Sequence, residues 1–351
     1  SACFGSRRSH VQVVSPRHML YHDAIYGEME IDEPVILELL KSPTMQRLKG
    51  VDKAGYRPLW VKPQISKDSS QMSRFDHSVG VYLLLKKYSA PLEEQIAGLI
   101  HDVSHTAFSH CIDYVLAEGS QKNHDYQDNA FDSYVRRSDI PRILTKHGFD
   151  LERVLNDANF PLKENKLPDI CADRIDYSLR DAKFYDEATA EDIAYLLNEL
   201  SATDGRWVFK SFESAKKFAE LFYKMNQIYY ASFSGVVMHQ AVGDYVKLAL
   251  DKNYISFEDL YTTDREVLDK IAVHLPQDEK SRHLFERLEG RVRGVEDLQN
   301  FEIKSFCKSR AVDPLFERDG KVIRVSDVDP VWGETVGKEN QPKEYFLRFE
   351  N

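Results

Sequence analysis

The chain has 351 residues, of which 42% are hydrophobic and 30% charged, and 47 Lys and Arg against 57 Asp and Glu give a formal net charge of −10. This composition is typical of a globular protein, and the acidic balance argues against a strong binder of nucleic acid or anionic membranes. The longest apolar runs are too short for a transmembrane helix. The four cysteines are scattered without a CxxC pair, which favours a reducing, cytoplasmic setting.

Helical spacing of apolar residues dominates the chain. Residues 1–22 begin polar and basic, and we expect them to be poorly ordered or of non-native origin. Helices are predicted over 33–40, 45–51, 74–88, 92–103, 126–135, 167–181 and 214–249, with two short helices over 140–155 separated near Gly148 and further helices to residue 289. Pro43 should restart one helix and Pro168 should begin another. Residues 55–61 suggest a turn and strand, and 63–71 an exposed loop.

Strand patterns are short and lie mostly near the C-terminus. A strand is expected at 27–31, and Asp204-Gly205 and Asp319-Gly320 are hairpin signals. Further strands are predicted at 309–312, 321–325 and 345–349. The fold class is therefore mostly α, with a helical core over 23–300 and a small α+β appendage over 301–351.

The most informative stretch follows the apolar helix that ends near Ile100. His101 and Asp102 are adjacent there, and His105 comes one helical turn later. Ionisable groups at the end of a buried helix are costly unless they are compensated, and a divalent metal ion would compensate both. The alternative is a core histidine beside a salt-bridged aspartate.

A second stretch carries several charges on one helical face. Asp173, Asp176, Tyr177, Arg180 and Asp181 follow the spacing i, i+3, i+4, i+7 and i+8. They could form a solvated face with Asp–Arg pairs, but the intervening apolar residues leave little room for an exposed helix.

Four residues are candidate metal ligands: His77, His101, Asp102 and Asp173. Two imidazoles and two carboxylates suit Fe, Mn, Zn, Ni or Mg, and they exclude a purely thiolate site. Four protein ligands on an octahedral ion would leave positions open for water and a phosphate oxygen. A bound divalent ion can lower the pKa of water from about 16 toward about 7.

The ordered pattern H…HD…D resembles that of the HD-domain metal-dependent phosphohydrolases. Within that family, several runs are similar to the deoxynucleoside triphosphate triphosphohydrolase branch. They are Pro43-x-x-Gln46-Arg47-Leu48, Arg74 to Gly80, His101 to His110, Asp173 to Asp181, and Lys308 to Pro314. The resemblance spans roughly residues 31–325, without a SAM domain.

The resemblance implies a role for each matching residue. His77, His101, Asp102 and Asp173 would hold one divalent metal, and additional Mg could accompany the substrate phosphates. His105 would be the general acid, and His124, with Asp113 as its partner, would tune protonation near neutral pH. The substrate would be lined by Arg74, His110, Arg174, Tyr177 and Asp181. The two arginines would hold triphosphate oxygens, and Tyr177 and Asp181 would contact the sugar.

The implied reaction is hydrolysis of a deoxynucleoside triphosphate to nucleoside and triphosphate, by metal-activated water attacking the α-phosphorus. The family also implies a homo-oligomer, from dimer to hexamer. Departures at Lys41, Lys53-Ala54 and Met238-His239 leave base preference and activation by a guanine nucleotide open. Two other functions stay open: an HD phosphohydrolase of monophosphates, cyclic nucleotides or alarmones, and a nucleotide-sensing module. His105 and His110 could pack helices, and Arg174 and Asp181 could be a plain ion pair.

Overall fold

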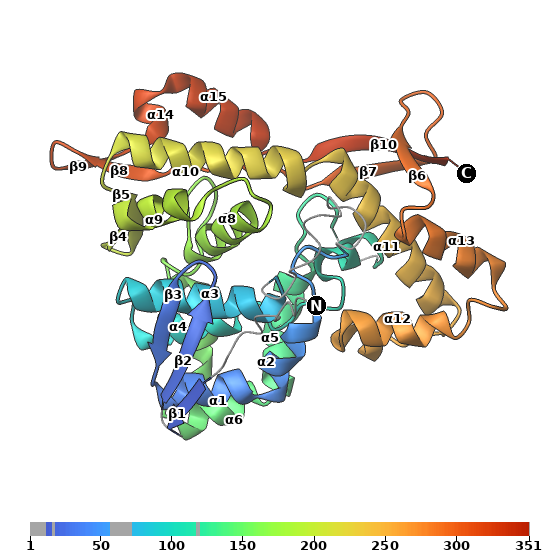
Figure 1. Cartoon of the computed structure of the whole chain (residues 1–351), viewed down its shortest axis with the longest axis horizontal. Helices are drawn as coiled ribbons and strands as arrows, with labels where there is room; N and C mark the ends of the chain where they lie inside the picture. The colour runs from blue at the N-terminus through green and yellow to red at the C-terminus, as the bar shows by residue number, and fades with distance from the viewer. Residues whose placement is uncertain (1–11, 16–17, 57–71, 117–119, 351) are drawn as a thin grey trace, which may run out of the picture.

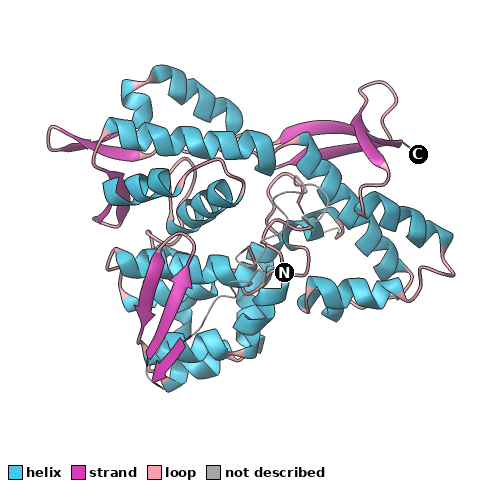
Figure 2. Cartoon of the chain, viewed as in Figure 1, coloured by secondary structure: helices cyan, strands magenta, loops and turns pink. Residues whose placement is uncertain are grey.

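A computed structural model describes residues 12–15, 18–56, 72–116 and 120–350 of the chain. Helices make up most of it, and three small sheets lie at separate places on the helical body (Figure 2). This confirms the predicted mostly-α class. None of the helices in these residues is long and apolar enough to cross a membrane.

The first sheet lies near the N-terminus and has the order β1–β2–β3. It consists of β1 (Gln12–Ser15), β2 (His18–Asp23) and β3 (Gly27–Ile31), all antiparallel. The strand at 27–31 is thus confirmed, and residues 18–22 lie in β2, within the stretch expected to be poorly ordered or of non-native origin. Met19 and Tyr21 alternate inward along β2 and join the core, which anchors this strand.

Helices α3 and α4 pack together at the centre of the N-terminal group of helices. A capping box of Ser73 and Asp76 starts α3 (Arg74–Lys87), and α4 (Leu92–Ile100) packs against it through apolar side chains such as Leu83 and Ile96. Around this pair lie α1 (Pro34–Lys41), α2 (Pro43–Arg47), η1 (Leu48–Gly50), η2 (Ser109–Tyr114), α5 (Tyr126–Arg137), α6 (Ile140–Lys146), α7 (Leu151–Leu155) and η3 (Asp157–Asn159). The predicted break at Pro43 is confirmed.

The later helices complete the body (Figure 1). They are α8 (Ala172–Phe184), α9 (Ala190–Glu199), α10 (Phe212–Met225), η4 (Asn226–Tyr230), α11 (Phe233–Asp251), η5 (Glu258–Tyr261), α12 (Asp264–Ala272), α13 (Glu279–Leu288), α14 (Val325–Val328) and α15 (Pro330–Glu339). Two predictions need correction. Helix α8 begins at Ala172 rather than near Pro168, and the π-helical turn η4 divides the expected continuous helix over 214–249.

The C-terminal strands complete two sheets that begin in the core. One sheet has the order β4 (Leu200–Thr203), β5 (Arg206–Phe209), β8 (Leu315–Arg318), β9 (Lys321–Arg324); the other has the order β6 (Arg293–Glu296), β10 (Lys343–Glu350), β7 (Ile303–Cys307). Both hairpin predictions are confirmed. Because β8 pairs with β5 and β10 pairs with β6, the predicted appendage shares its sheets with the core.

The strand expected at 309–312 is not formed. The Ala311 amide donates to Asn340 Oδ1, and the Asp313 amide donates to the Pro168 carbonyl, so this buried segment satisfies its backbone outside any ladder. Most of the turn and strand expected at 55–61, and the loop at 63–71, lie outside the described residues.

Candidate active site

The four predicted metal ligands come together from three helices. His77 lies in the first turns of α3, His101 and Asp102 follow the end of α4, and Asp173 lies in the first turn of α8. Asp173 Oδ1 is 2.9 Å from His77 Nε2 and 3.5 Å from His101 Nε2. Asp102 lies 3.4 Å from His101 Nε2 through one oxygen and 3.8 Å from His77 Nε2 through the other. The helix termini thus bring ligand atoms of His77, His101 and Asp173 within 4.8 Å of one another, and Asp102 lies beside this group.

The far nitrogen of each ligand histidine is held by a hydrogen bond. His77 Nδ1 is 2.7 Å from Asp176 Oδ2, and His101 Nδ1 is 2.8 Å from the Gly98 carbonyl. With Nδ1 as the donor, each Nε2 keeps its lone pair toward the shared point, as metal-binding histidines require. Within the described residues, His101 Nε2 is buried without a hydrogen-bond partner. The donor set therefore fits one divalent ion.

Electrostatics at this point also favour a bound cation. Burial alone would raise the pKa of Asp102, but Arg74 and the neighbouring imidazoles hold it well below its ordinary value. For His101, burial opposes protonation, yet Asp102 and Asp173 raise the pKa to about 9. The carboxylates therefore stabilise positive charge between them, which either an imidazolium or a metal ion provides.

Three further histidines continue from the metal ligands as a row of rings. The ring centroids of His105 and His110 are 4.9 Å apart, and those of His110 and His124 are 5.1 Å apart. His105 Nε2 lies 3.3 Å from Asp102, while burial, followed by the charge of Arg74, lowers the pKa of His105 to about 4. The predicted general acid therefore stands beside the ligands and needs the negative charge of a substrate to hold its proton.

Asp113 takes a different place from the one expected. Its carboxylate lies 3.5 Å from His110 Nδ1 and accepts the backbone amides of Ser120 and Tyr126, whereas His124 faces the Tyr114 hydroxyl. Burial raises the pKa of Asp113 to about 7. The carboxylate is thus positioned to act on His110, and its predicted partnership with His124 stays a prediction.

A cavity of about 490 Å³ opens over the metal ligands and this row of rings. Its size lies in the range of roughly 300–1,000 Å³ that is typical of small-molecule sites. Both predicted substrate arginines line it but are engaged by the protein. Arg74 donates to Asp102 at 2.8 Å, and Arg174 lies 3.0 Å from Glu164. The two arginines position these acids, and a substrate phosphate would compete with the acids for the N–H donors of the arginines.

Two other cations line the cavity without a carboxylate partner at ion-pair distance in the described chain. They are Lys308 and Arg310, which follow β7. Arg310 lies 3.4 Å from the Tyr177 hydroxyl, and Tyr177 in turn contacts the His77 ring. The charge of Arg310, with burial, lowers the pKa of Lys308 to about 8. Two mutually repelling cations beside the candidate metal ligands favour the presence of an anion between them.

The predicted sugar-side residues also line the cavity. Asp181 has one carboxylate oxygen 2.6 Å from Lys53 Nζ, and its other oxygen accepts from the Tyr230 hydroxyl at 3.0 Å. From the sequence, Lys53 is only a departure from the family pattern, and Lys308 and Arg310 are only members of a run similar to that of the family. The proximity of Lys308 and Arg310 to the candidate metal ligands depends on the path of the chain after β7, which no local pattern reveals.

Comparison with known proteins agrees with this geometry. No protein-family model matches the chain. It is 36% identical to the uncharacterized protein YdhJ of Bacillus subtilis, with 87% of the chain and 91% of that protein covered. It is 30% identical to the metal-dependent phosphohydrolase cns2 of Cordyceps militaris, with 92% of each covered. The chain belongs to the HD-domain metal-dependent phosphohydrolases.

More distant matches extend the family likeness. The phosphohydrolase is 25% identical to a deoxynucleoside triphosphate triphosphohydrolase SAMHD1 homolog of Dictyostelium discoideum, over 64% of the chain and 48% of that protein. A crystal structure of a hypothetical protein from Aquifex aeolicus shares the fold, with a TM-score of 0.70 at 18% identity over 95% of the chain and 96% of the other. The fold of this phosphohydrolase is therefore one that solved structures share along nearly its whole length.

Proposed function

We propose that this phosphohydrolase converts deoxynucleoside triphosphates to deoxynucleoside and triphosphate. The observation that carries the proposal is the pair Lys308 and Arg310, two cations without a carboxylate partner in the described chain, on the wall of a cavity that also contains the metal ligands. A polyphosphate carries enough negative charge to pair with both cations and with a bound metal ion. The distant likeness to proteins named deoxynucleoside triphosphate triphosphohydrolase supports the same choice of substrate.

The proposed roles follow from the placement of each side chain. When bound, a divalent ion would supply Lewis-acid polarisation of a phosphoryl oxygen and a lowered pKa for water. Lys308 and Arg310 would bind the outer phosphates, and Arg74 would keep Asp102 oriented at 2.8 Å. His105 would give its proton to the departing 5′ oxygen of the nucleoside.

The other predicted residues complete the proposed site. Tyr177 and Asp181 would contact the sugar, with Lys53 and Tyr230 fixing the carboxylate of Asp181. His110 would line the substrate, with Asp113 beside it. Arg174 would bind a phosphate oxygen only if its ion pair with Glu164 breaks.

A panel of nucleotides analysed by product chromatography tests this function. The full-length, metal-loaded enzyme should release nucleoside and intact triphosphate from deoxynucleoside triphosphates. Arg310→Ala should weaken the reaction, whereas Lys304→Ala should not, because Lys304 lies on β7 with its exposed side chain paired to Glu344. Release of orthophosphate or pyrophosphate in steps would contradict the proposal.

The second candidate is an HD phosphohydrolase of nucleoside monophosphates, cyclic nucleotides or alarmones. The observation in its favour is the ion pair of Lys53 and Asp181, which occupies the carboxylate that would otherwise contact the deoxyribose. The same panel separates the two, since this candidate predicts turnover of monophosphates or alarmones and no triphosphate product. The predicted homo-oligomer is a separate proposal, which light scattering of the purified chain would test.

A further inference from the structure

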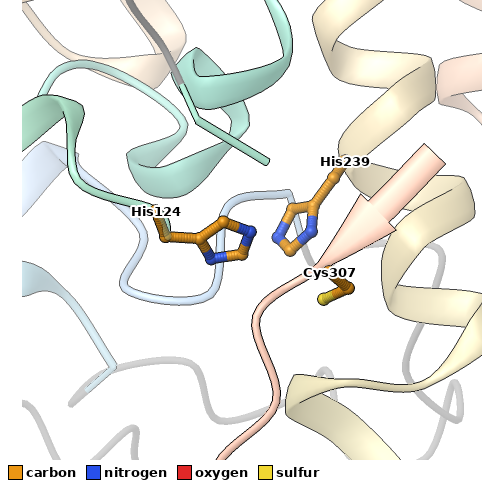
Figure 3. Close-up of side chains that lie close together, drawn as sticks. All are labelled: His124, His239 and Cys307. Atoms are coloured by element: carbon orange, nitrogen blue, oxygen red, sulfur yellow. The ribbon is translucent and has the colours of Figure 1, made fainter. Parts of the chain in front are cut away.

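A second cluster of side chains that could hold a metal ion lies beside the same cavity. It consists of His124, in the loop before α5, His239 on α11 and Cys307 at the end of β7. One nitrogen or sulfur atom from each lies within 4.8 Å of the other two. Figure 3 shows the two imidazole rings and the thiol meeting from these three separate elements.

The cluster is enclosed, and its polar atoms are poorly satisfied. His124, His239 and Cys307 are 6%, 9% and 0% exposed. In the described chain, His239 Nδ1 is buried without a hydrogen-bond partner, a situation that typically costs about 1–3 kcal/mol. His124 Nε2 lies 3.4 Å from the Tyr114 hydroxyl, beyond the usual range of about 2.7–3.2 Å. That hydroxyl donates instead to the Phe306 carbonyl at 2.7 Å.

The protonation of these groups suits a cation. Burial lowers the pKa of His239 to about 4 and that of His124 well below its ordinary value, so both imidazoles are neutral and keep a lone pair. The Cys307 thiol faces the Tyr230 carbonyl at 3.2 Å, and burial raises its pKa to about 11. A bound ion would displace the thiol proton, which would leave as one proton per ion.

We propose that His124, His239 and Cys307 bind a second divalent metal ion of the zinc class. Two imidazoles and one thiolate match the borderline-soft preference of zinc, whose ligand atoms lie about 2.0–2.3 Å from the ion. This ion is distinct from the first, because the His110 ring separates His124 from His105.

The proposed ion keeps one coordination position toward the cavity. His124 and His239 both line the cavity that also contains the candidate ligands of the first metal. Cys307 is fully buried and is not among the residues that line this cavity. A three-ligand zinc site with an open fourth position is the arrangement of catalytic zinc. The open position would take water or an anionic oxygen of the substrate. The proposal replaces the protonation role expected for His124 with that of a ligand, and it stands whether or not the substrate is a triphosphate.

Cobalt substitution tests the site without an activity assay. The metal-free full chain is titrated with Co²⁺, and the near-ultraviolet thiolate-to-cobalt charge-transfer band is recorded together with proton release. The expected result is a thiolate band that stops growing once one Co²⁺ ion per chain occupies this site. Cys307→Ser and His239→Ala should lose the band, and Cys111→Ser, a buried cysteine next to Met238, should keep it.

Two further variants test whether the band comes from this cluster or from a neighbouring one. His101→Ala removes a ligand of the first centre and should leave the thiolate band unchanged. Cys171→Ser should also keep it, although Glu164, Cys171 and Asp173 form another close group. No thiolate band in the wild-type chain, or a band that survives Cys307→Ser, overturns the proposal. The wild-type titration gives this answer even if a variant fails to fold.

Discussion

Asp176→Asn should weaken both the fold and the metal centre. Asp176 is fully buried, lies 2.7 Å from His77 Nδ1, and accepts two bonds from Arg180 at 2.8 and 3.0 Å. Asn keeps the shape but loses the charge. Breaking a buried ion pair costs about 3–5 kcal/mol. Because Asp23 still holds Arg180 at 3.0 Å, we expect the lower end, about 3 kcal/mol.

This loss can be converted into measurable shifts. With an unfolding entropy of about 2.1 cal/mol/K per residue over 351 residues, a loss of ~3 kcal/mol lowers Tm by about 4 °C. Without its charged partner, His77 is less firmly oriented, and metal affinity should fall by about 10–100-fold. Circular dichroism of the metal-free chain measures the first effect. Competition with a chromophoric chelator measures the second, using Mn²⁺, which a cysteine-containing site disfavours.

An exposed Asp–Arg pair provides the matched control. Asp132 pairs with Arg136 at 2.7 Å on the surface of α5, so Asp132→Asn should change neither Tm nor metal affinity. The reasoning is refuted if Asp176→Asn binds Mn²⁺ as tightly as the wild type, or if its Tm equals that of the control.

Three further predictions concern the cavity. His105→Ala should lower kcat by about 10²–10⁴-fold while the metal content stays constant, and a parallel loss of metal would make His105 a structural residue instead. Arg310→Ala should remove a charge-assisted contact worth about 1.5–3 kcal/mol and raise KM for the triphosphate by about 10–150-fold, an effect that Lys304→Ala should lack. Burial raises the pKa of Asp113 from 3.8 to about 7, so the folded chain binds a proton that the unfolded chain releases. The unfolding free energy of the wild type therefore falls as pH rises from about 4 to 7. Asp113→Asn lacks this titration, so its Tm relative to that of the wild type should increase across the same window. A Tm difference that does not change with pH would argue against a raised pKa of Asp113.

The convergence of the candidate metal ligands could be expected from the sequence because these residues lie at helix ends. A His-Asp pair after an apolar helix, a histidine in the first turns of another and an aspartate opening a third are local patterns. These residues could be distinguished from the other acids and histidines because they follow the order of motifs known from the family. In the structure, their nitrogen and oxygen atoms lie close together.

The cations and the second cluster could not be predicted in this way. His239 stood out in the sequence only as a departure from the family pattern, and Cys307 showed no partner nearby in sequence. Their meeting with His124 depends on how α11 and β7 pack, which is tertiary information. The strand wrongly expected at 309–312 has the same origin, since the Asn340 side chain replaces a neighbouring strand as the partner of Ala311.

Hydrolysis of a deoxynucleoside triphosphate in ¹⁸O-labelled water tests the proposed reaction most directly. Attack at the α-phosphorus breaks its bond to the 5′ oxygen, so mass spectrometry should find one ¹⁸O atom in the released triphosphate and none in the nucleoside. Label in the nucleoside, or in orthophosphate or pyrophosphate released in place of triphosphate, would contradict the account.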